Sequence, residues 1–201
     1  MTEGAVQRQR KTKDPCPGCA LHKVRCICAV IPSLDLKTKV TLIIHARELK
    51  RTTNTGTLAL KALVNSEMRV RGREHSRADH SDLLSPAYET YILFPSEDAL
   101  DLEEISPRKP VQLIVADGNW RQAAKVNHRY PEFGSIPRVK INHRNEATEH
   151  LRKEHFESGM STLEAIARAL KIIEGEEVGR ILLGLYDAKL RATLSGRGRL
   201  K

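Results

Sequence analysis

Asp117 is the side chain in this sequence best placed to do chemistry. It follows an apolar, largely β-branched run at residues 111–116 and precedes Gly118. Such a run predicts a buried strand of a parallel sheet, and open α/β sheets bind ligands beyond the carboxyl ends of their strands. A carboxylate at that place can bind a ligand or take a proton. The structural alternative is that Asp117 caps the next helix while Trp120, the only tryptophan, packs in the core.

A second polar group follows an earlier predicted strand at residues 39–44. Its members recur at every third position: His45, Glu48, Arg51 and Asn54. Thr55 comes next, just before an expected helix. Between a strand end and a helix N-terminus, these side chains offer donors and acceptors to a ligand. A solvated loop in which Asn54 or Thr55 caps the helix accounts for the same residues, and the two roles are compatible.

Ser161, Thr162 and Glu164 open a later predicted helix. The Ser-x-x-Glu spacing is typical of a capping box, in which the hydroxyl and the carboxylate bind free backbone N–H groups reciprocally. That structural role is sufficient for the motif. The amide groups of a helix N-terminus can also receive a carboxylate or a ribose, so both roles stay open.

All four cysteines lie close together in the N-terminal part of the chain: Cys16, Cys19, Cys26 and Cys28. Two close pairs joined by a short loop can surround a tetrahedral zinc ion. An iron–sulfur cluster is the alternative metal site, and disulfides are disfavoured in a chain of this size without a secretory signal. Four thiolates leave zinc no open position for water. We therefore expect a structural zinc knuckle that ties the N-terminal segment to the main domain.

The composition favours a polyanionic partner. The chain has 201 residues, enough for one domain with a small appended module, and a net charge of +9. Aromatic residues make up only 4%, which argues against a surface that stacks several bases of a single strand, so a structured RNA fits better. No apolar run approaches the length of a membrane span, and we expect a cytoplasmic location without membrane contact.

The elements that must position these groups alternate between strands and helices. Strands are predicted at residues 39–44, 68–70, 88–94, 111–116 and 138–141, and helices at residues 58–64, 120–129, 161–173 and 176–194. This alternation predicts an α/β fold with a mostly parallel sheet and flanking helices. The expected organisation is a disordered basic arm at 1–14, the knuckle at 15–33 and the main domain at 34–201, with residues 72–85 unassigned.

The motifs, in this order, resemble the pattern of the DTW-domain family, the tRNA-uridine aminocarboxypropyltransferases. That pattern joins an N-terminal cysteine cluster, H-x-x-E-x-x-R-x-x-N-T, D-x-T-W and S-T-x-E-A, and the resemblance covers residues 15–175. One position departs from it, because Asn119 stands where the family has threonine. Asparagine keeps a hydrogen-bonding side chain but lacks the β-branched methyl group.

The resemblance implies an activity and a fold. The activity is transfer of the 3-amino-3-carboxypropyl group of S-adenosylmethionine to N3 of a tRNA uridine, with release of 5′-methylthioadenosine. The fold is SPOUT-related, with a C-terminal trefoil knot. S-adenosylmethionine is then the co-substrate, tRNA the partner and zinc the structural metal, and no obligate protein partner is implied.

The same resemblance implies roles for the matching positions. Asp117 is the candidate general base for the uridine N3 proton; alternatively it binds the cofactor or orients the base while solvent takes the proton. Cofactor binding is expected from Asn54, Thr55, Asp117, Asn119, Trp120, Ser161, Thr162 and Glu164. Substrate binding is expected from His45, Glu48, Arg51 and Trp120.

The tRNA surface is expected to combine the basic arm with basic side chains of several later segments: Lys23, Arg25, Arg69, Arg71, Arg73, Arg197, Arg199 and Lys201. Two other functions fit parts of the pattern. A SPOUT-type RNA methyltransferase shares the fold and the cofactor, and the sulfur product of the reaction distinguishes it. A non-catalytic, zinc-stabilised RNA-binding protein accounts for the charge and the cysteines, and specific cofactor binding would exclude it.

Overall fold

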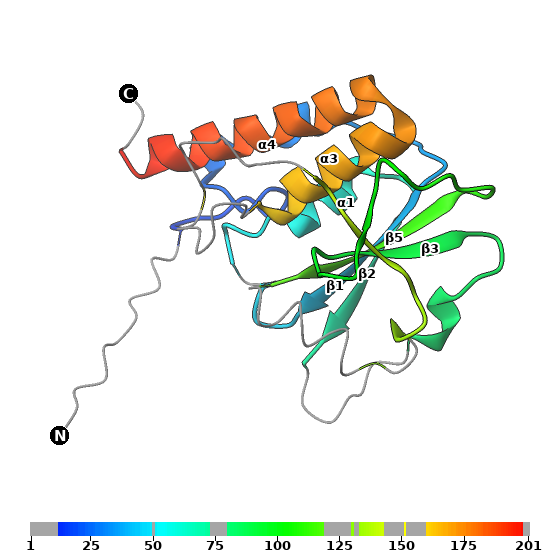
Figure 1. Ribbon diagram of the computed structural model, residues 1–201. Helices are drawn as coiled ribbons and strands as arrows, with labels where there is room; N and C mark the ends of the chain where they lie inside the picture. The colour runs from blue at the N-terminus through cyan, green and yellow to red at the C-terminus, as the bar shows by residue number, and fades with distance from the viewer. Residues whose placement is uncertain are drawn as a thin grey trace.

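A six-stranded sheet is the frame of the computed structural model, which describes residues 12–49, 51–72, 80–118, 130, 133–142, 151 and 160–198 (Figure 1). The strands are β1 (Lys39–His45), β2 (Ser66–Arg71), β3 (Glu89–Leu93), β4 (Leu100–Asp101), β5 (Val111–Asp117) and β6 (Arg138–Lys140). They run in the order β2-β1-β5-β3-β6-β4 and pair in parallel throughout. The helices are α1 (Gly56–Ala62), α3 (Thr162–Glu174) and α4 (Glu176–Gly196), with 3-10 turns at Lys23–Arg25, Cys28–Val30 and Ser81–Leu83.

The predicted α/β class and parallel sheet are confirmed. Strand β4 is the element that the sequence did not predict, because its two residues at the edge of the sheet are too few to show a periodic pattern. Helix α1 begins two residues before the predicted start and ends at Ala62. The helix predicted at 120–129 lies outside the described residues.

Alternating side chains of the two central strands pack on opposite faces of the sheet. Leu42 of β1 and Leu113 of β5 belong to the core on the helical face, together with α3 residues such as Leu163 and Ile166. The intervening residues Ile43 and Ile114 pack on the other face with Leu83 and Phe133. Apolar runs buried on both faces explain why these strands contain almost no exposed position.

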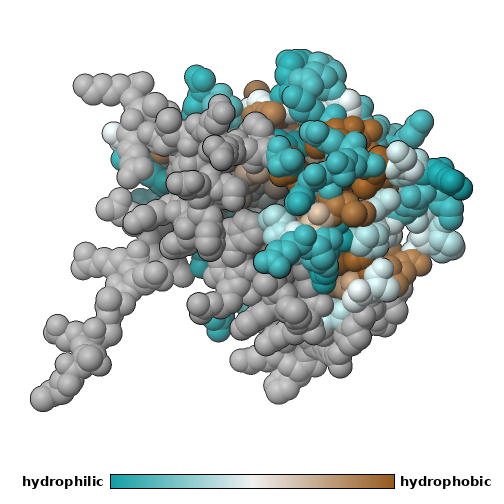
Figure 2. All heavy atoms as spheres, viewed as in Figure 1, coloured by the Kyte–Doolittle hydropathy of each residue, from teal (hydrophilic) through white to brown (hydrophobic). Residues whose placement is uncertain are grey.

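Helices α3 and α4 form a hairpin that covers one face of the sheet together with α1 (Figure 1). The hairpin turns at Gly175, whose φ of 112° lies in a region that L side chains rarely adopt. In Figure 2, hydrophilic side chains dominate the described outer surface of this layer, and apolar residues show in patches between them.

The N-terminal cysteine segment packs on the same core. Cys19, Leu21 and Ile27 are buried with the apolar residues of the helical face. The segment begins with a pairing of Pro15 with His22, and the backbone N–H of Cys16 donates to the carbonyl of Leu21 at 2.6 Å. Among the residues that the structure describes, no helix is both long and apolar enough to cross a bilayer.

Candidate active site

Asp117 lies at the carboxyl end of β5, the strand inserted between β1 and β3. At this point the strand order departs from the chain order, and crevices of this kind are where open α/β sheets bind ligands. The side chain is only 5% exposed. Its Oδ1 accepts a hydrogen bond from the hydroxyl of Thr162 at 2.5 Å, and its Oδ2 accepts one from the amide of Asn54. The three separate motifs therefore meet at one carboxylate.

The threefold spacing of the second motif corresponds to a chain of backbone turns. The N–H of Glu48 donates to the carbonyl of His45 at 2.8 Å, that of Arg51 to Glu48 at 3.0 Å, and that of Asn54 to Arg51 at 3.0 Å. Each member of the motif is thus bonded to the next. The turns lead the chain from the end of β1 to the start of α1 and deliver Asn54 beside Asp117.

Asn54 caps helix α1 and also contacts Asp117. Its Oδ1 accepts from the backbone N–H of Thr57 and from the hydroxyl of Thr57, both at 3.0 Å, so it caps the first turn of α1. Its amide nitrogen donates to Asp117. Thr55 does not cap α1 with its side chain; its hydroxyl accepts from the backbone N–H of Leu163 at 3.2 Å and joins α1 to α3.

Gly56 makes this approach sterically feasible. A Cβ at this position would lie 2.9 Å from Cδ2 of Leu42 and 3.1 Å from Oδ2 of Asp117. Both distances are shorter than ordinary carbon contacts. The start of α1 can therefore reach the carboxylate only because residue 56 has no side chain.

Half of the capping box predicted at α3 is present. The Oγ of Ser161 accepts from the backbone N–H of Glu164 at 3.2 Å. The carboxylate of Glu164 instead accepts from Arg168 at 3.1 Å, one turn along the helix, where a guanidinium provides a stronger, charge-assisted bond. Its second oxygen, Oε2, is buried and has no hydrogen-bond partner within the described part of the chain.

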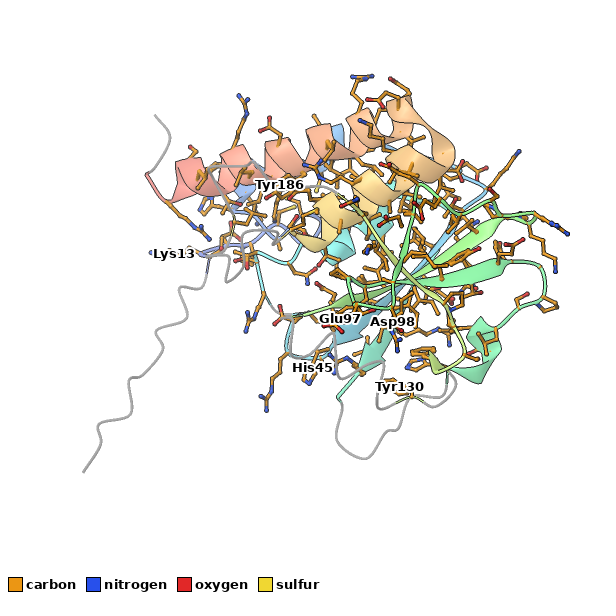
Figure 3. The ribbon with its side chains drawn as sticks, viewed as in Figure 1. Lys13, His45, Glu97, Asp98, Tyr130 and Tyr186 are labelled. Carbon is orange, nitrogen blue, oxygen red and sulfur yellow. The ribbon has the colours of Figure 1, made fainter. Side chains whose placement is uncertain are left out.

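The predicted substrate-binding residues lie along the loop after β1. Glu48 is 2% exposed and forms an ion pair with Arg51 at 3.1 Å, whereas the Arg51 side chain is half exposed. His45 lies at the carboxyl end of β1 (Figure 3), and its Nδ1 accepts from the backbone N–H of Arg47 at 3.2 Å. Its ring packs over Gly72, where a Cβ would lie 2.5 Å from Nε2. Asn119 and Trp120 lie outside the described residues.

The four cysteines form one cluster of free thiols, with ligand atoms all within 4.8 Å of one another. The Sγ of Cys16 is 3.4 Å from that of Cys26 and 3.6 Å from that of Cys28, and Cys19 and Cys26 are 3.8 Å apart. Four sulfurs placed tetrahedrally at the zinc–thiolate distance are separated by about 3.8 Å. Separations of this size exclude disulfide bonds and fit a metal ion. Gly18 leaves room for the cluster, because a Cβ there would lie 2.4 Å from Cys28 Sγ.

The local electrostatics also fit a metal. Backbone N–H groups of Cys19 and Gly18 lower the pKa of Cys16 to about 6, whereas hydrogen bonding with Cys26 and burial raise the pKa of Cys28 to about 12. The metal-bound form of cysteine is the thiolate, so a divalent ion bound here would hold both side chains in that form.

Two lysines donate to backbone carbonyls of the cysteine segment. The Nζ of Lys189 is fully buried and donates to the carbonyl of Cys19 at 2.6 Å, and the Nζ of Lys61 donates to that of Gly18 at 2.6 Å. Burial lowers the pKa of Lys189, and the neighbouring cysteines oppose that shift. A buried cation needs a counter-charge, and a tetrathiolate centre supplies one. The sequence did not predict Lys189, since a lysine in a helix is usually solvated.

Only some of the basic side chains predicted for the tRNA surface are exposed in the described part of the chain. Arg71, the last residue of β2, is only 5% exposed, which contradicts its predicted place on the tRNA surface. Arg69 is engaged by Glu67 at 3.0 Å and by Asp82 at 2.7 Å, and Lys23 pairs with Asp14 at 3.0 Å. Arg25 and Arg197 are exposed. Three further predicted contacts lie outside the described residues: Arg73, Arg199 and Lys201.

Three relatives show what this chain is similar to. A tRNA-uridine aminocarboxypropyltransferase 2 of Macaca fascicularis is 28% identical over 172 residues, which cover 82% of this chain and 58% of that protein. A tRNA-uridine aminocarboxypropyltransferase A of Arabidopsis thaliana is 29% identical over 212 residues, covering 88% of this chain and 79% of that protein. The transferase 2 of Drosophila melanogaster is 26% identical, with coverages of 81% and 67%. The chain thus spans less than two thirds of the macaque protein's length.

No solved structure matches the chain, but a family profile covers most of its sequence. The profile of the DTW domain matches residues 13–194, a span that includes the cysteine cluster, Asp117 and the start of α3. The chain therefore belongs to the DTW-domain family.

Proposed function

We propose that this protein transfers the 3-amino-3-carboxypropyl group of S-adenosylmethionine to N3 of a tRNA uridine and releases 5′-methylthioadenosine. The observation that carries the proposal is the meeting of Asn54, Thr162 and Asp117 at the carboxyl end of β5. Family membership and the names of the relatives support the same reaction. The net charge of +9 suits a tRNA substrate.

The reaction needs positioning more than activation. The sulfonium of S-adenosylmethionine makes the adjoining carbons electrophilic and methylthioadenosine a good leaving group. In the transfer, uridine N3 forms a bond to the aminocarboxypropyl carbon, the carbon–sulfur bond breaks with its electron pair going to sulfur, and the N3 proton leaves. The methyl carbon competes on the same sulfur. The protein must therefore hold one carbon, and not the other, in line with N3.

In this proposal Asp117 takes the N3 proton. Each of its carboxylate oxygens accepts one hydrogen bond from the motifs. Asn54 and Thr162 hold the carboxylate in a fixed orientation, and its burial keeps bulk water away. The competing role, in which Asp117 only orients the base or the cofactor, predicts that an amide at this position supports turnover.

The other motif residues are proposed to bind the two substrates. Cofactor contacts are assigned to the groups around Asp117: Asn54, Thr55, Asn119, Trp120, Ser161, Thr162 and Glu164. The buried Oε2 of Glu164, which accepts no hydrogen bond from the described residues, suits the ammonium of the aminocarboxypropyl group. Substrate contacts are assigned to His45, Glu48, Arg51 and Trp120. The half-exposed guanidinium of Arg51, whose Nε is held by Glu48, suits a carboxylate or a phosphate.

Zinc is the proposed metal of the cysteine cluster, with a structural role. Cys16, Cys19, Cys26 and Cys28 would supply all four ligands and leave no position for substrate. An iron–sulfur cluster is the alternative, and metal analysis with an absorption spectrum separates the two. Free thiols in a segment of this kind also support a reducing, cytoplasmic location.

We also propose how the chain is divided into segments and to which fold its main domain is related. We assign residues 1–14 to a basic arm, 15–33 to the knuckle and 34–201 to the transferase domain. Kinship with the SPOUT fold and a C-terminal knot are proposed from the family resemblance. The segments 143–150 and 152–159, which precede α3, lie outside the described residues.

The test is incubation of the protein with S-adenosylmethionine and unmodified tRNA, followed by mass spectrometry of the nucleosides. The expected product is aminocarboxypropyl-uridine, with one equivalent of methylthioadenosine. Formation of S-adenosylhomocysteine would instead indicate a methyltransferase. Asp117→Asn is expected to bind both substrates and lose most turnover; near-normal turnover in a folded variant would remove the proton-accepting role from Asp117.

A further inference from the structure

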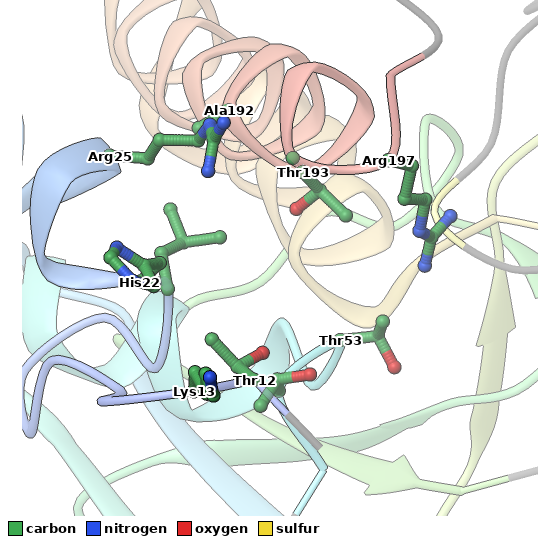
Figure 4. A pocket seen from close by; sticks show the side chains of 11 residues that line it. Thr12, Lys13, His22, Arg25, Thr53, Ala192, Thr193 and Arg197 are labelled. Atoms are coloured by element: carbon green, nitrogen blue, oxygen red, sulfur yellow. The ribbon is translucent and has the colours of Figure 1, made fainter. Parts of the chain in front are cut away.

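A cavity of about 550 Å³ opens between three parts of the chain that lie far apart in sequence (Figure 4). The cysteine segment contributes His22 and Arg25 on one side, and the C-terminal end of α4 contributes Arg197 on the other. Lys13 and Thr53 complete the lining, and Figure 3 shows Lys13 beneath the C-terminal part of α4. Asp117, Asn54 and Thr162 do not line this cavity, so it is distinct from the candidate active site.

The cavity concentrates positive charge without compensation. Of the described residues that line it, Lys13, Arg25 and Arg197 are cations and none carries a carboxylate. By contrast, six arginines elsewhere on the described surface are paired with carboxylates: Arg51, Arg69, Arg138, Arg168, Arg180 and Arg191. None of the three lining cations forms an ion pair with another described residue. Such a cluster costs free energy through mutual repulsion and is relieved by a bound anion.

The other side chains that line the cavity favour a phosphate over a base or S-adenosylmethionine. Thr12 and Thr52 line the same cavity as the cations, and their hydroxyls can donate to phosphate oxygens. The hydroxyl of Thr193 is already directed to the carbonyl of Lys189 at 2.7 Å. None of the described residues that line the cavity is a phenylalanine, tyrosine or tryptophan, so they offer no such ring on which a base could stack. A cationic sulfonium would be repelled here, which argues against a second S-adenosylmethionine site.

We infer that this cavity receives a backbone phosphate of the tRNA and thereby sets the position of the tRNA relative to Asp117. The inference rests on the proposed function and identifies where its substrate is held. Thr52 and Thr53 directly precede Asn54, which donates to Asp117, so a phosphate bound here lies beside the loop that reaches the active site. Phosphate contacts set register and orientation on a nucleic acid without reading its sequence.

The inference also gives the cysteine knuckle a role in substrate binding. Arg25 lies in the short turn Lys23–Arg25, directly before the ligand Cys26. Its guanidinium lies beside the end of α4, with Nη1 3.8 Å from the position a Cβ would take at Gly196. Metal binding by the knuckle would fix one wall of the phosphate site. Loss of the metal is then expected to weaken tRNA binding.

The test measures tRNA affinity at several salt concentrations for Arg25→Gln and Arg197→Gln. The matched control is Arg180→Gln, which removes the same charge from α4 at a position paired with Glu177 and outside the cavity. Each cavity variant should weaken binding roughly three- to tenfold at low salt. Each should also reduce the slope of log affinity against log salt by about 0.7 to 0.9, the value for one phosphate contact. The affinity for S-adenosylmethionine should stay unchanged, because neither arginine lies in the candidate active site.

Two results separate this inference from the proposed function. If both cavity variants match Arg180→Gln in affinity and salt slope while the wild-type protein still forms aminocarboxypropyl-uridine, the cavity assignment is wrong and the function stands. If the wild-type protein forms no such nucleoside, the proposed reaction is wrong. The binding measurements would then still report whether the cavity holds a phosphate of RNA.

Discussion

Replacing Thr162 with valine tests whether Asp117 is the structural centre of the site. The substitution keeps the shape of the side chain and removes the hydroxyl that donates to Asp117 Oδ1 at 2.5 Å. The acceptor is a carboxylate that is only 5% exposed, so water does not easily replace the lost donor. A hydrogen bond to a buried charged group contributes about 1.5–3 kcal/mol to the free energy of unfolding. With a urea m-value of about 2 kcal/mol/M, a loss of about 2 kcal/mol lowers the unfolding midpoint by about 1 M.

The assay is urea unfolding of the metal-loaded protein, followed by circular dichroism. Thr193→Val is the matched control, because the hydroxyl of Thr193 donates to the carbonyl of Lys189 within the same helix, α4, at 2.7 Å. Removal of this hydroxyl should change the free energy of unfolding by less than about 0.5 kcal/mol. In the Asp117→Asn background, Thr162→Val should cost at least about 1 kcal/mol less than in the wild type, since the two side chains are in contact. A cost no larger than that of the control, or strict additivity with Asp117→Asn, would refute the reasoning.

Three further predictions follow from individual contacts. Gly56→Ala should destabilise the protein by about 1–3 kcal/mol in urea unfolding and weaken S-adenosylmethionine binding, because the added Cβ would press on Asp117. The control is Gly184→Ala, where an added Cβ would meet no atom of another part of the chain within 4 Å, and it should not destabilise the protein. Lys189→Met should lower zinc affinity about tenfold or more in a chelator competition, and an unchanged affinity would show that the buried cation does not support the metal site. Burial raises the pKa of Glu67, but hydrogen bonds from Lys39 and Thr41 outweigh it and hold that pKa below its usual range. The charge of Glu67 therefore stabilises the fold at pH values above the pKa of this group in the unfolded chain. This stabilisation is lost as the pH falls through the lowered pKa of Glu67 in the folded protein. Glu67→Gln should accordingly lower the free energy of unfolding by about 1 kcal/mol at neutral pH, and this difference from the wild type should shrink in acid. A difference in unfolding free energy that does not depend on pH would contradict this.

The sequence predicted the central strands because they are buried on both faces and therefore read as apolar runs. It also placed Asp117 at a strand end, where the structure brings Asn54 and Thr162 to it. It could not show that the threefold spacing of the loop after β1 is a series of backbone turns, since side-chain types do not report backbone hydrogen bonds.

Other features depend on long-range packing that one sequence does not encode locally. Lys189 is 170 residues from Cys19 in the chain, and only the packing of α4 on the knuckle joins them. The same packing places Arg25 and Arg197 on opposite sides of one cavity (Figure 4). Arg71 was wrongly expected on the surface, because a charged residue at the end of a strand gives no sign in one sequence of how far packing will bury it.

The origin of the transferred carbon tests the central claim most directly. The measurement uses two preparations of S-adenosylmethionine, one labelled with carbon-13 in the aminocarboxypropyl chain and one in the methyl group, each incubated with the protein and unmodified tRNA. The account predicts that uridine acquires the label of the aminocarboxypropyl chain, and that the methyl label leaves in methylthioadenosine. Methyl label in the tRNA, or tRNA without either label, would contradict it.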